Sequence, residues 1–176
     1  RKILVVGSGK STAYLLDYLL QKAEAENLHI TICDLNPEAL PERIKLDPSC
    51  TVFKLDIFND RERSKVIEQS DIVISMLPAR FHIKVAVDCI QFSKHLVTAS
   101  YISDDILALD QQAKEKGLVF MNEIGLDPGI DHMSAMQVID NIRKRGGKII
   151  LFESFTGGLV APESDNNLWN YKFTWN

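Results

Sequence analysis

Short apolar runs alternate with amphipathic stretches over the first 120 residues of the chain. Residues 3–6 are continuously apolar, which is typical of a strand buried on both faces of a parallel sheet. In residues 11–26 the apolar positions recur three and four residues apart, which predicts a helix with one apolar face. The same two patterns predict strands over residues 29–33, 51–55, 71–75, 95–98 and 118–120, and helices over residues 61–69, 82–92 and 104–116. This alternation predicts an α/β fold, a Rossmann doubly wound parallel sheet with right-handed crossovers.

The pattern changes after residue 120. Residues 122–131 are rich in turn formers, and residues 130–143 follow as a longer amphipathic stretch. A pair of glycines, Gly146 and Gly147, should end that helix, and residues 148–155 then predict a longer strand.

This change indicates a domain boundary. We expect an NAD(P)-binding Rossmann domain over residues 1–130. We expect residues 131–176 to hold a linking helix and the first strand and loop of a second α/β domain. Because the aromatic residues near the end of the chain have no predicted element to pack on, we expect this second domain to be truncated.

Charge and composition exclude several classes of protein. The formal net charge of −4 and the pI near 5.6 argue against a nucleic-acid partner. No apolar run approaches the ~20 residues of a membrane span. The three cysteines, Cys33, Cys50 and Cys89, form no C-x-x-C pair, so we expect reduced thiols, no metal site and a cytoplasmic protein.

A glycine-rich turn joins the first predicted strand to the first helix. Gly7-Ser8-Gly9 fits the dinucleotide fingerprint G-x-G-x-x-G/A if Thr12 takes the third glycine position. A Walker A loop would need a glycine five residues before Gly9, where the chain has Leu4. The alternative is a turn that binds nothing. We expect a pyrophosphate site made by the loop and the start of the helix, at Gly7, Ser8, Gly9, Lys10 and Ser11.

An acidic residue ends the second predicted strand. Asp34 lies 27 residues after Gly7, where a carboxylate holds the ribose hydroxyls of a dinucleotide. Asp34 and the adjoining Leu35 have no neighbouring Arg or Lys to receive a 2′-phosphate, so this pattern favours NAD over NADP.

The loop after the fourth predicted strand should line the same crevice. We expect Ser75, Met76 and Leu77 to contact the cofactor and Pro78 to contact the substrate, although a plain strand-to-helix connection explains this loop equally well. Polar His82 and Lys84, in the helix that follows, should form a solvated face.

Three later stretches are more specific than a Rossmann pattern. They are T-A-S-Y-I-S at residues 98–103, M-N-E-I-G-L-D-P-G-I-D-H at residues 121–132 and G-G-L-V-A-P-E-S at residues 157–164. Together with Y-K-F at residues 171–173 they resemble saccharopine dehydrogenase of the glutamate-forming type (saccharopine reductase). Related enzymes that make polyamine precursors share D-P-G and then diverge. Members of the family are longer than 176 residues, which agrees with a truncated second domain.

The resemblance implies an oxidoreductase of lysine metabolism. Saccharopine, NAD(P)⁺ and water would give L-glutamate, 2-aminoadipate 6-semialdehyde and NAD(P)H: hydride leaves the carbon beside the secondary amine, water adds to the imine, and the carbinolamine collapses. The protein would orient that carbon and move protons. We expect a homodimer through the second domain, and we expect the 176 residues alone to be inactive. The alternatives are an opine or carboxy-polyamine type dehydrogenase acting on another secondary amine, and a non-catalytic module that senses NAD(H).

The resemblance also implies site residues. Asp127 and Tyr101 are the expected catalytic pair and also touch the substrate, together with Ser100 and Gly157. We expect two neighbours of Asp127, namely Leu126 and Pro128, to contact the cofactor.

Each assignment has a structural alternative. Asp127 could only open a type II turn at Pro128-Gly129, and Tyr101 could only be an aromatic lid on a helix start. Thr156 stands where fungal relatives carry a cysteine, which leaves open whether a thiol takes part in proton transfer.

Overall fold

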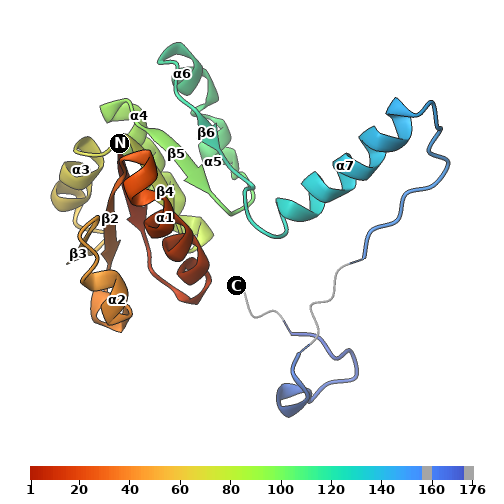
Figure 1. Ribbon diagram of the computed structural model, residues 1–176, viewed down its shortest axis with the longest axis horizontal. Helices are drawn as coiled ribbons and strands as arrows, with labels where there is room; N and C mark the ends of the chain where they lie inside the picture. The colour runs from red at the N-terminus through yellow and green to blue at the C-terminus, as the bar shows by residue number, and fades with distance from the viewer. Residues whose placement is uncertain (156–159, 173–176) are drawn as a thin grey trace. The chain divides into compact units, whose positions relative to one another are not determined.

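The computed structural model describes residues 1–155 and 160–172 and divides the chain into two compact units, Arg1–Ala135 and Met136–Asn176 (Figure 1). The first unit contains a six-stranded sheet whose neighbouring strands are all parallel, in the order β3-β2-β1-β4-β5-β6. The strands are β1 (Lys2–Val6), β2 (His29–Asp34), β3 (Cys50–Lys54), β4 (Ile72–Ser75), β5 (His95–Thr98) and β6 (Phe120–Met121). This is the strand order of a doubly wound dinucleotide-binding fold, so the predicted fold is confirmed.

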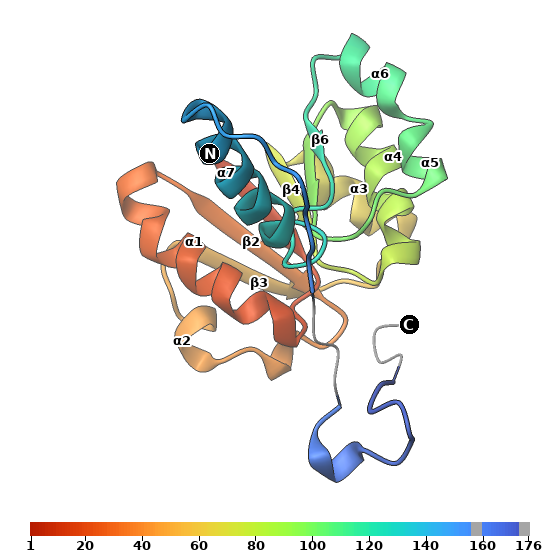
Figure 2. The same ribbon diagram turned by 90° about the vertical axis from the view of Figure 1, so that its right-hand side faces the viewer.

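Helices cover both faces of the sheet. The α-helices are α1 (Ala13–Glu26), α2 (Glu42–Lys45), α3 (Asp60–Glu68), α4 (His82–Phe92), α5 (Asp104–Leu107), α6 (Asp110–Glu115) and α7 (Ile130–Lys144). The short 3₁₀ turns are η1 (Lys10–Thr12), η2 (Pro37–Ala39), η3 (Ala79–Phe81) and η4 (Pro162–Ser164). Figure 2 shows α1 and α2 on one face of the sheet and α3, α4 and α5 on the other.

The apolar run of β1 is buried because it supplies both faces. Ile3 and Val5 pack in the core beneath α1 and α2, whereas Leu4 and Val6 pack in the core beneath α3 and α4. Alternate side chains of a strand point to opposite faces, so a strand between two helical layers needs apolar residues at every position.

The predicted helix over residues 104–116 is two helices, α5 and α6. Ser103 caps α5, because its hydroxyl accepts a hydrogen bond from the backbone N–H of Ile106 (3.4 Å). The helical ladder then breaks, since the N–H of Leu109 bonds to the carbonyl of Ile106, three residues back instead of four. This tighter turn lets Ile106 and Leu109 both pack on the core.

The predicted strand over residues 148–155 is wrong for this structure. None of these residues is in a strand, and Ile150 is 92% exposed. An extended segment becomes a strand only when a partner satisfies its N–H and C=O groups. Within the described residues of the second unit no such partner pairs with this segment.

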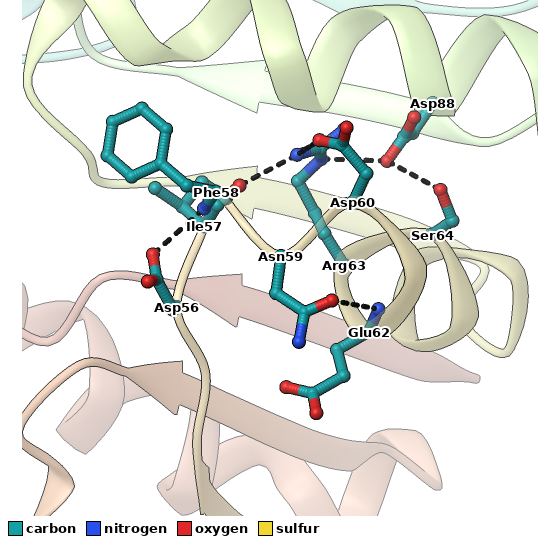
Figure 3. Close-up of polar contacts among 9 residues, drawn as sticks. All are labelled: Asp56, Ile57, Phe58, Asn59, Asp60, Glu62, Arg63, Ser64 and Asp88. Carbon is teal, nitrogen blue, oxygen red and sulfur yellow. Dashed lines mark hydrogen bonds and ion pairs between the residues drawn. The ribbon is translucent and has the colours of Figure 1, made fainter.

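A buried ion pair, not predicted from the sequence, joins α3 to α4 (Figure 3). Arg63 is 5% exposed, and its Nε donates to Oδ2 of Asp88, itself 4% exposed, at 2.8 Å. The Nη1 of Arg63 donates to the carbonyl of Ile57 (2.7 Å) and to the carboxylate of Asp60 (2.6 Å), and Ser64 donates to Asp88 (3.1 Å). The network therefore ties α4 to α3 and to the loop that follows β3.

Candidate functional site

The loops at the carboxyl ends of the strands form one continuous edge. The N–H of Gly7 bonds to the carbonyl of Cys33 (2.8 Å), and the N–H of Met76 bonds to the carbonyl of Val6 (2.8 Å). The loops after β1, β2 and β4 are thereby neighbours. The chain leaves β1 for β2 on one side and later returns to β4 on the other, and such a switch point is where doubly wound folds bind ligands.

The first turn of this edge requires a glycine. Gly7 has φ of +96°, and an added Cβ would lie 3.0 Å from the backbone C and O of Met76. Thr12, in the third position of the fingerprint, is fully buried, and its hydroxyl donates to the carbonyl of Gly7 (3.4 Å). The glycine loop is thus packed against both the loop after β4 and the start of the first helix.

The rest of the loop faces outward and could hold a pyrophosphate. A Cβ added to Gly9 would meet no atom within 4 Å, so the backbone there has open space on its outer side. Lys10 and Ser11 are exposed in η1, directly before α1, and Ser8 is half-buried. Free N–H groups at a helix start, with room for an anion to approach, fit the phosphates of a dinucleotide.

Asp34 lies directly beside this loop. Its Oδ2 accepts the N–H of Ser8 (2.6 Å) and its Oδ1 accepts the N–H of Asn36 (2.8 Å). Burial alone would raise the pKa of this carboxyl, but the N–H donors of Asn36 and Ser8 outweigh it and hold the pKa below its ordinary value. Asp34 is therefore an anion at neutral pH, able to accept hydrogen bonds from ribose hydroxyls. Leu35, next in the chain, is 53% exposed.

The residues at the end of β4 and in the loop after it differ in burial, and not all of them are placed to contact a cofactor. Met76 packs against the core of one sheet face and Leu77 against the core of the other, while Pro78 is exposed. Ser75, however, is fully buried, and its hydroxyl lies 2.8 Å from Nδ1 of His82. Its side chain is therefore turned away from the edge where a cofactor contact was expected.

The expectation of a solvated His82 is wrong. The side chain is only 2% exposed, because α4 begins at the sheet edge and its first residue points between the ends of β4 and β5. Burial lowers the pKa of His82 to about 4, so the imidazole is neutral in the physiological range. Lys84 is half-buried, with its ammonium 5.4 Å from the ring centroid of Phe58.

The two expected catalytic residues meet across two loops. The Oη of Tyr101, after β5, donates to Oδ1 of Asp127, after β6, at 2.9 Å. This hydrogen bond is the main cause that raises the pKa of the Tyr101 phenol above its ordinary value. Tyr101 is 64% exposed and Asp127 is also exposed, so both could reach a bound molecule. Ser100, half-buried, directly precedes Tyr101.

Backbone contacts hold the Asp127 loop against β5. The N–H of Ile124 bonds to the carbonyl of Thr98 (3.2 Å), and the N–H of Glu123 bonds to the carbonyl of Ser100 (3.0 Å). Glu123 has φ of +63° and its carboxylate accepts the N–H of Ile102 (3.1 Å). Glu123 was not predicted from the sequence, because nothing in the local pattern shows which backbone N–H its carboxylate reaches.

The D-P-G turn differs from the type II turn considered as an alternative. The peptide bond between Asp127 and Pro128 is cis, and the N–H of Gly125 bonds to the carbonyl of Pro128 (2.8 Å). Pro128 is buried, whereas Leu126 is 75% exposed. Of these two expected cofactor contacts, only Leu126 presents its side chain at the surface. Gly157 and Thr156 lie outside the described residues.

A hollow of about 300 Å³ lies at the opposite edge of the sheet, at the amino ends of β1 and β2, and includes Lys2 and His29 in its lining. Among residues 1–155 and 160–172, no cluster of three or more His, Cys, Asp or Glu side chains is placed to hold a metal ion. No helix in the described parts of the chain is long and apolar enough to cross a membrane.

Comparison with known proteins identifies the relatives of this arrangement. The family model described as "Saccharopine dehydrogenase NADP binding domain" matches residues 3–121, and "Saccharopine dehydrogenase C-terminal domain" matches residues 125–176. A saccharopine dehydrogenase [NADP(+), L-glutamate-forming] from Pyricularia oryzae is 39% identical over 99% of this chain and 38% of its own. An α-aminoadipic semialdehyde synthase from Arabidopsis thaliana is 39% identical over 87% of this chain and 14% of its own.

Solved structures of known proteins have the same fold. Apo saccharopine dehydrogenase (L-Glu forming) from Saccharomyces cerevisiae has a TM-score of 0.80 and 35% identity, over 99% of this chain and 38% of that one. WlbA dehydrogenase from Bordetella pertussis, in complex with NADH and UDP-GlcNAcA, has a TM-score of 0.59 at 18% identity and shares the fold alone. The chain thus spans 38% of the length of these glutamate-forming relatives.

The strand order, the glycine loop and the match over residues 3–121 agree on a nicotinamide-dinucleotide-binding domain. The expected resemblance is confirmed: this chain belongs to the saccharopine dehydrogenase family.

Proposed function

We propose that the polypeptide containing this chain oxidises saccharopine, with NAD(P)⁺ and water, to L-glutamate and 2-aminoadipate 6-semialdehyde. The observation that carries this proposal is the Tyr101–Asp127 hydrogen bond of 2.9 Å at the sheet edge that also bears the dinucleotide loop. The printed names of the relatives support the same reaction.

The side chains at this edge have distinct tasks in the proposal. A bound nicotinamide supplies the hydride acceptor. The Asp127 carboxylate takes a proton from the secondary ammonium of the substrate, because it is exposed and acceptor-only when ionised. Tyr101 orients that carboxylate through its phenol, and Ser100 and Pro78 line the substrate side of the edge.

The organisation of the whole protein is part of the proposal. We place the boundary near residue 130, with residues 1–130 binding the cofactor and residues 131–176 opening the substrate and dimerisation domain. The two family models meet between residues 121 and 125, which supports a boundary in this region. The three free thiols, Cys33, Cys50 and Cys89, support a reducing compartment, and we propose the cytoplasm.

The direct test uses the longest natural polypeptide that contains these residues, called the parent polypeptide below. Saccharopine, an opine and a carboxy-polyamine would each be supplied with NAD⁺ or NADP⁺, and NAD(P)H formation followed by absorbance. We expect the parent polypeptide to oxidise saccharopine but not the opine or the carboxy-polyamine. We expect no turnover from the isolated 176 residues. Turnover only with another secondary amine, or cofactor binding without turnover in the parent polypeptide, would reject the proposal.

Asp34 leads us to propose NAD as the preferred cofactor, although the comparisons favour NADP: the family model over residues 3–121 is described as an NADP binding domain, and the fungal relatives carry NADP(+) in their names. Within the part of the chain that the structure describes, Asp34 forms no ion pair, so no cationic side chain offsets the repulsion between its carboxylate and a 2′-phosphate. We expect the parent polypeptide to have a higher kcat/KM with NAD⁺ than with NADP⁺.

Asp34→Asn should reverse much of that preference. The substitution removes the charged acceptor for the ribose hydroxyls, and charge-assisted hydrogen bonds contribute about 1.5–3 kcal/mol, so the ratio of kcat/KM for NAD⁺ over NADP⁺ should fall at least about tenfold. Asp105→Asn, at an exposed position of α5, is the matched control and should leave the ratio unchanged. A wild-type preference for NADP⁺, or an unchanged ratio in Asp34→Asn, would show that Asp34 does not select the cofactor.

A further inference from the structure

A buried histidine joins the two strand ends that lead to the proposed reactive edge. The Nδ1 of His82 lies 2.8 Å from the hydroxyl of Ser75, the last residue of β4. Its Nε2 lies 2.8 Å from the hydroxyl of Ser100 and 3.0 Å from that of Thr98, the last residue of β5. Since Ser75 and Thr98 are register partners in adjacent strands, the imidazole bridges the ends of both strands and reaches the residue before Tyr101.

The chemistry of this bridge favours a fixed geometry. A neutral imidazole has one N–H donor and one acceptor nitrogen, and hydroxyl groups can serve as either partner. Both ring nitrogens of His82 have hydroxyl partners, and Ser75 and Thr98 are fully buried. Removing one member would leave a buried polar group unsatisfied, so the network resists rearrangement.

The bridge acts on the site through Ser100. The N–H of Ser100 donates to the hydroxyl of Thr98 (3.2 Å), and the carbonyl of Ser100 accepts the N–H of Glu123 (3.0 Å). The hydroxyl of Ser100 contacts His82. Three anchors therefore define the backbone at Ser100, and Tyr101 leaves this point toward Asp127.

A role in moving protons fits this arrangement poorly. A proton passed from Ser100 to His82 would find only Ser75 and Thr98 beyond the imidazole, and both of these hydroxyls are fully buried. A relay needs a route to solvent or to a second titrating group, and these contacts supply neither.

We propose that His82 is a positioning residue that, through Nε2 and Ser100, sets the Tyr101–Asp127 pair on which the proposed function rests. The Nδ1 contact with Ser75 anchors the ring, and the Nε2 contact transmits its position to the edge.

Two amide variants separate these contacts, because each can reproduce the position of one ring nitrogen. Asparagine can place a polar atom near the position of Nδ1, so His82→Asn keeps the anchor and loses the contact with Ser100. Glutamine reaches the position of Nε2, so His82→Gln keeps the contact with Ser100. We expect His82→Asn to lower kcat for saccharopine oxidation about ten- to hundredfold, because small displacements of reacting groups cost that much. His82→Gln should have a kcat much closer to that of the wild type. When each of the two variants is combined with Ser100→Ala, their kcat values should become equal.

A second measurement does not depend on activity. Tyrosine labelled with ¹³C at Cζ would be titrated by NMR, with the Tyr101 signal assigned from Tyr101→Phe. In His82→Asn the pKa of Tyr101 should fall toward the ordinary value, because the hydrogen bond to Asp127 is lost or loosened, while His82→Gln should keep it raised. His29→Asn, in an exposed histidine that contacts Thr51 at the other sheet edge, is the matched control and should change neither quantity.

The outcomes are distinct. If His82→Asn and His82→Gln lower kcat equally and leave the pKa of Tyr101 unchanged, His82 has only a structural role and the inference is overturned. Loss of one limb of the pH–rate profile in both variants would also overturn it, since that marks a proton-transfer group. If wild-type protein does not oxidise saccharopine, the proposed function fails, and the Tyr101 titration alone decides the role of His82.

Discussion

Asp127→Asn should lower kcat for saccharopine oxidation by the parent polypeptide about 10²- to 10³-fold, the loss that follows removal of a general acid–base group. Asparagine keeps the size of the side chain and can still accept the hydrogen bond from Tyr101, but it cannot take a proton from an ammonium group. The KM for the cofactor should change little, because the glycine loop and Asp34 are untouched. Steady-state kinetics over a range of pH measure both quantities.

Two companion variants sharpen this test. Tyr101→Phe removes the orienting phenol but not the carboxylate, so its loss in kcat should be smaller than that of Asp127→Asn. Asp110→Asn, in an exposed i,i+4 pair with Lys114 on α6, is the matched control for removing a surface carboxylate. A kcat within threefold of wild type in Asp127→Asn would remove Asp127 from the proton chemistry.

Asp88→Ala should destabilise the protein by about 3–5 kcal/mol, the loss typical when one partner of a buried ion pair is removed. Arg63 would then lose its bond from Nε while remaining in a nearly solvent-free site, and Ser64 would lose its acceptor. The contacts of Arg63 with Ile57 and Asp60 would persist and offset only part of this loss (Figure 3). Urea unfolding, compared through the midpoint at constant slope, measures the change.

The chain supplies a matched control for this prediction. Asp17 and Arg43 form a bidentate pair between α1 and α2, but at the surface, so Asp17→Ala should change the midpoint little. Replacing both Arg63 and Asp88 by leucine should restore much of the stability lost in Asp88→Ala, because no buried charge then lacks its partner on the neighbouring helix. Equal midpoint shifts in Asp88→Ala and Asp17→Ala would contradict the assignment of a buried structural pair.

Local pattern was sufficient for much of the first unit. The apolar run of β1, the glycine at position 7 and the carboxylate at position 34 were all predicted from spacing, and each lies where it was expected. These features depend on neighbours in sequence: a strand buried on two faces needs consecutive apolar residues, and a tight turn at positive φ needs glycine.

The sequence pattern gave wrong predictions where the structure of a segment depends on contacts with other parts of the chain. Residues 148–155 contain an apolar run suited to a strand, but pairing requires a second strand that the described residues do not provide. His82 was expected at the surface because a polar residue on a helix is usually exposed. Three hydroxyls from other elements surround it instead, and the sequence pattern of α4 does not contain them.

The sequence by itself determined the Rossmann architecture, the dinucleotide loop and, through three stretches of residues, membership of the saccharopine dehydrogenase family. Only the tertiary structure decided which side chains meet. Tyr101 and Asp127 are 26 residues apart, as are Ser8 and Asp34, and Arg63 and Asp88 are 25 apart. These contacts arise because parallel strands bring the ends of distant segments to one edge, and because helices on one face pack side by side. Pairing and burial across such distances depend on the folded chain, so no local pattern contains them.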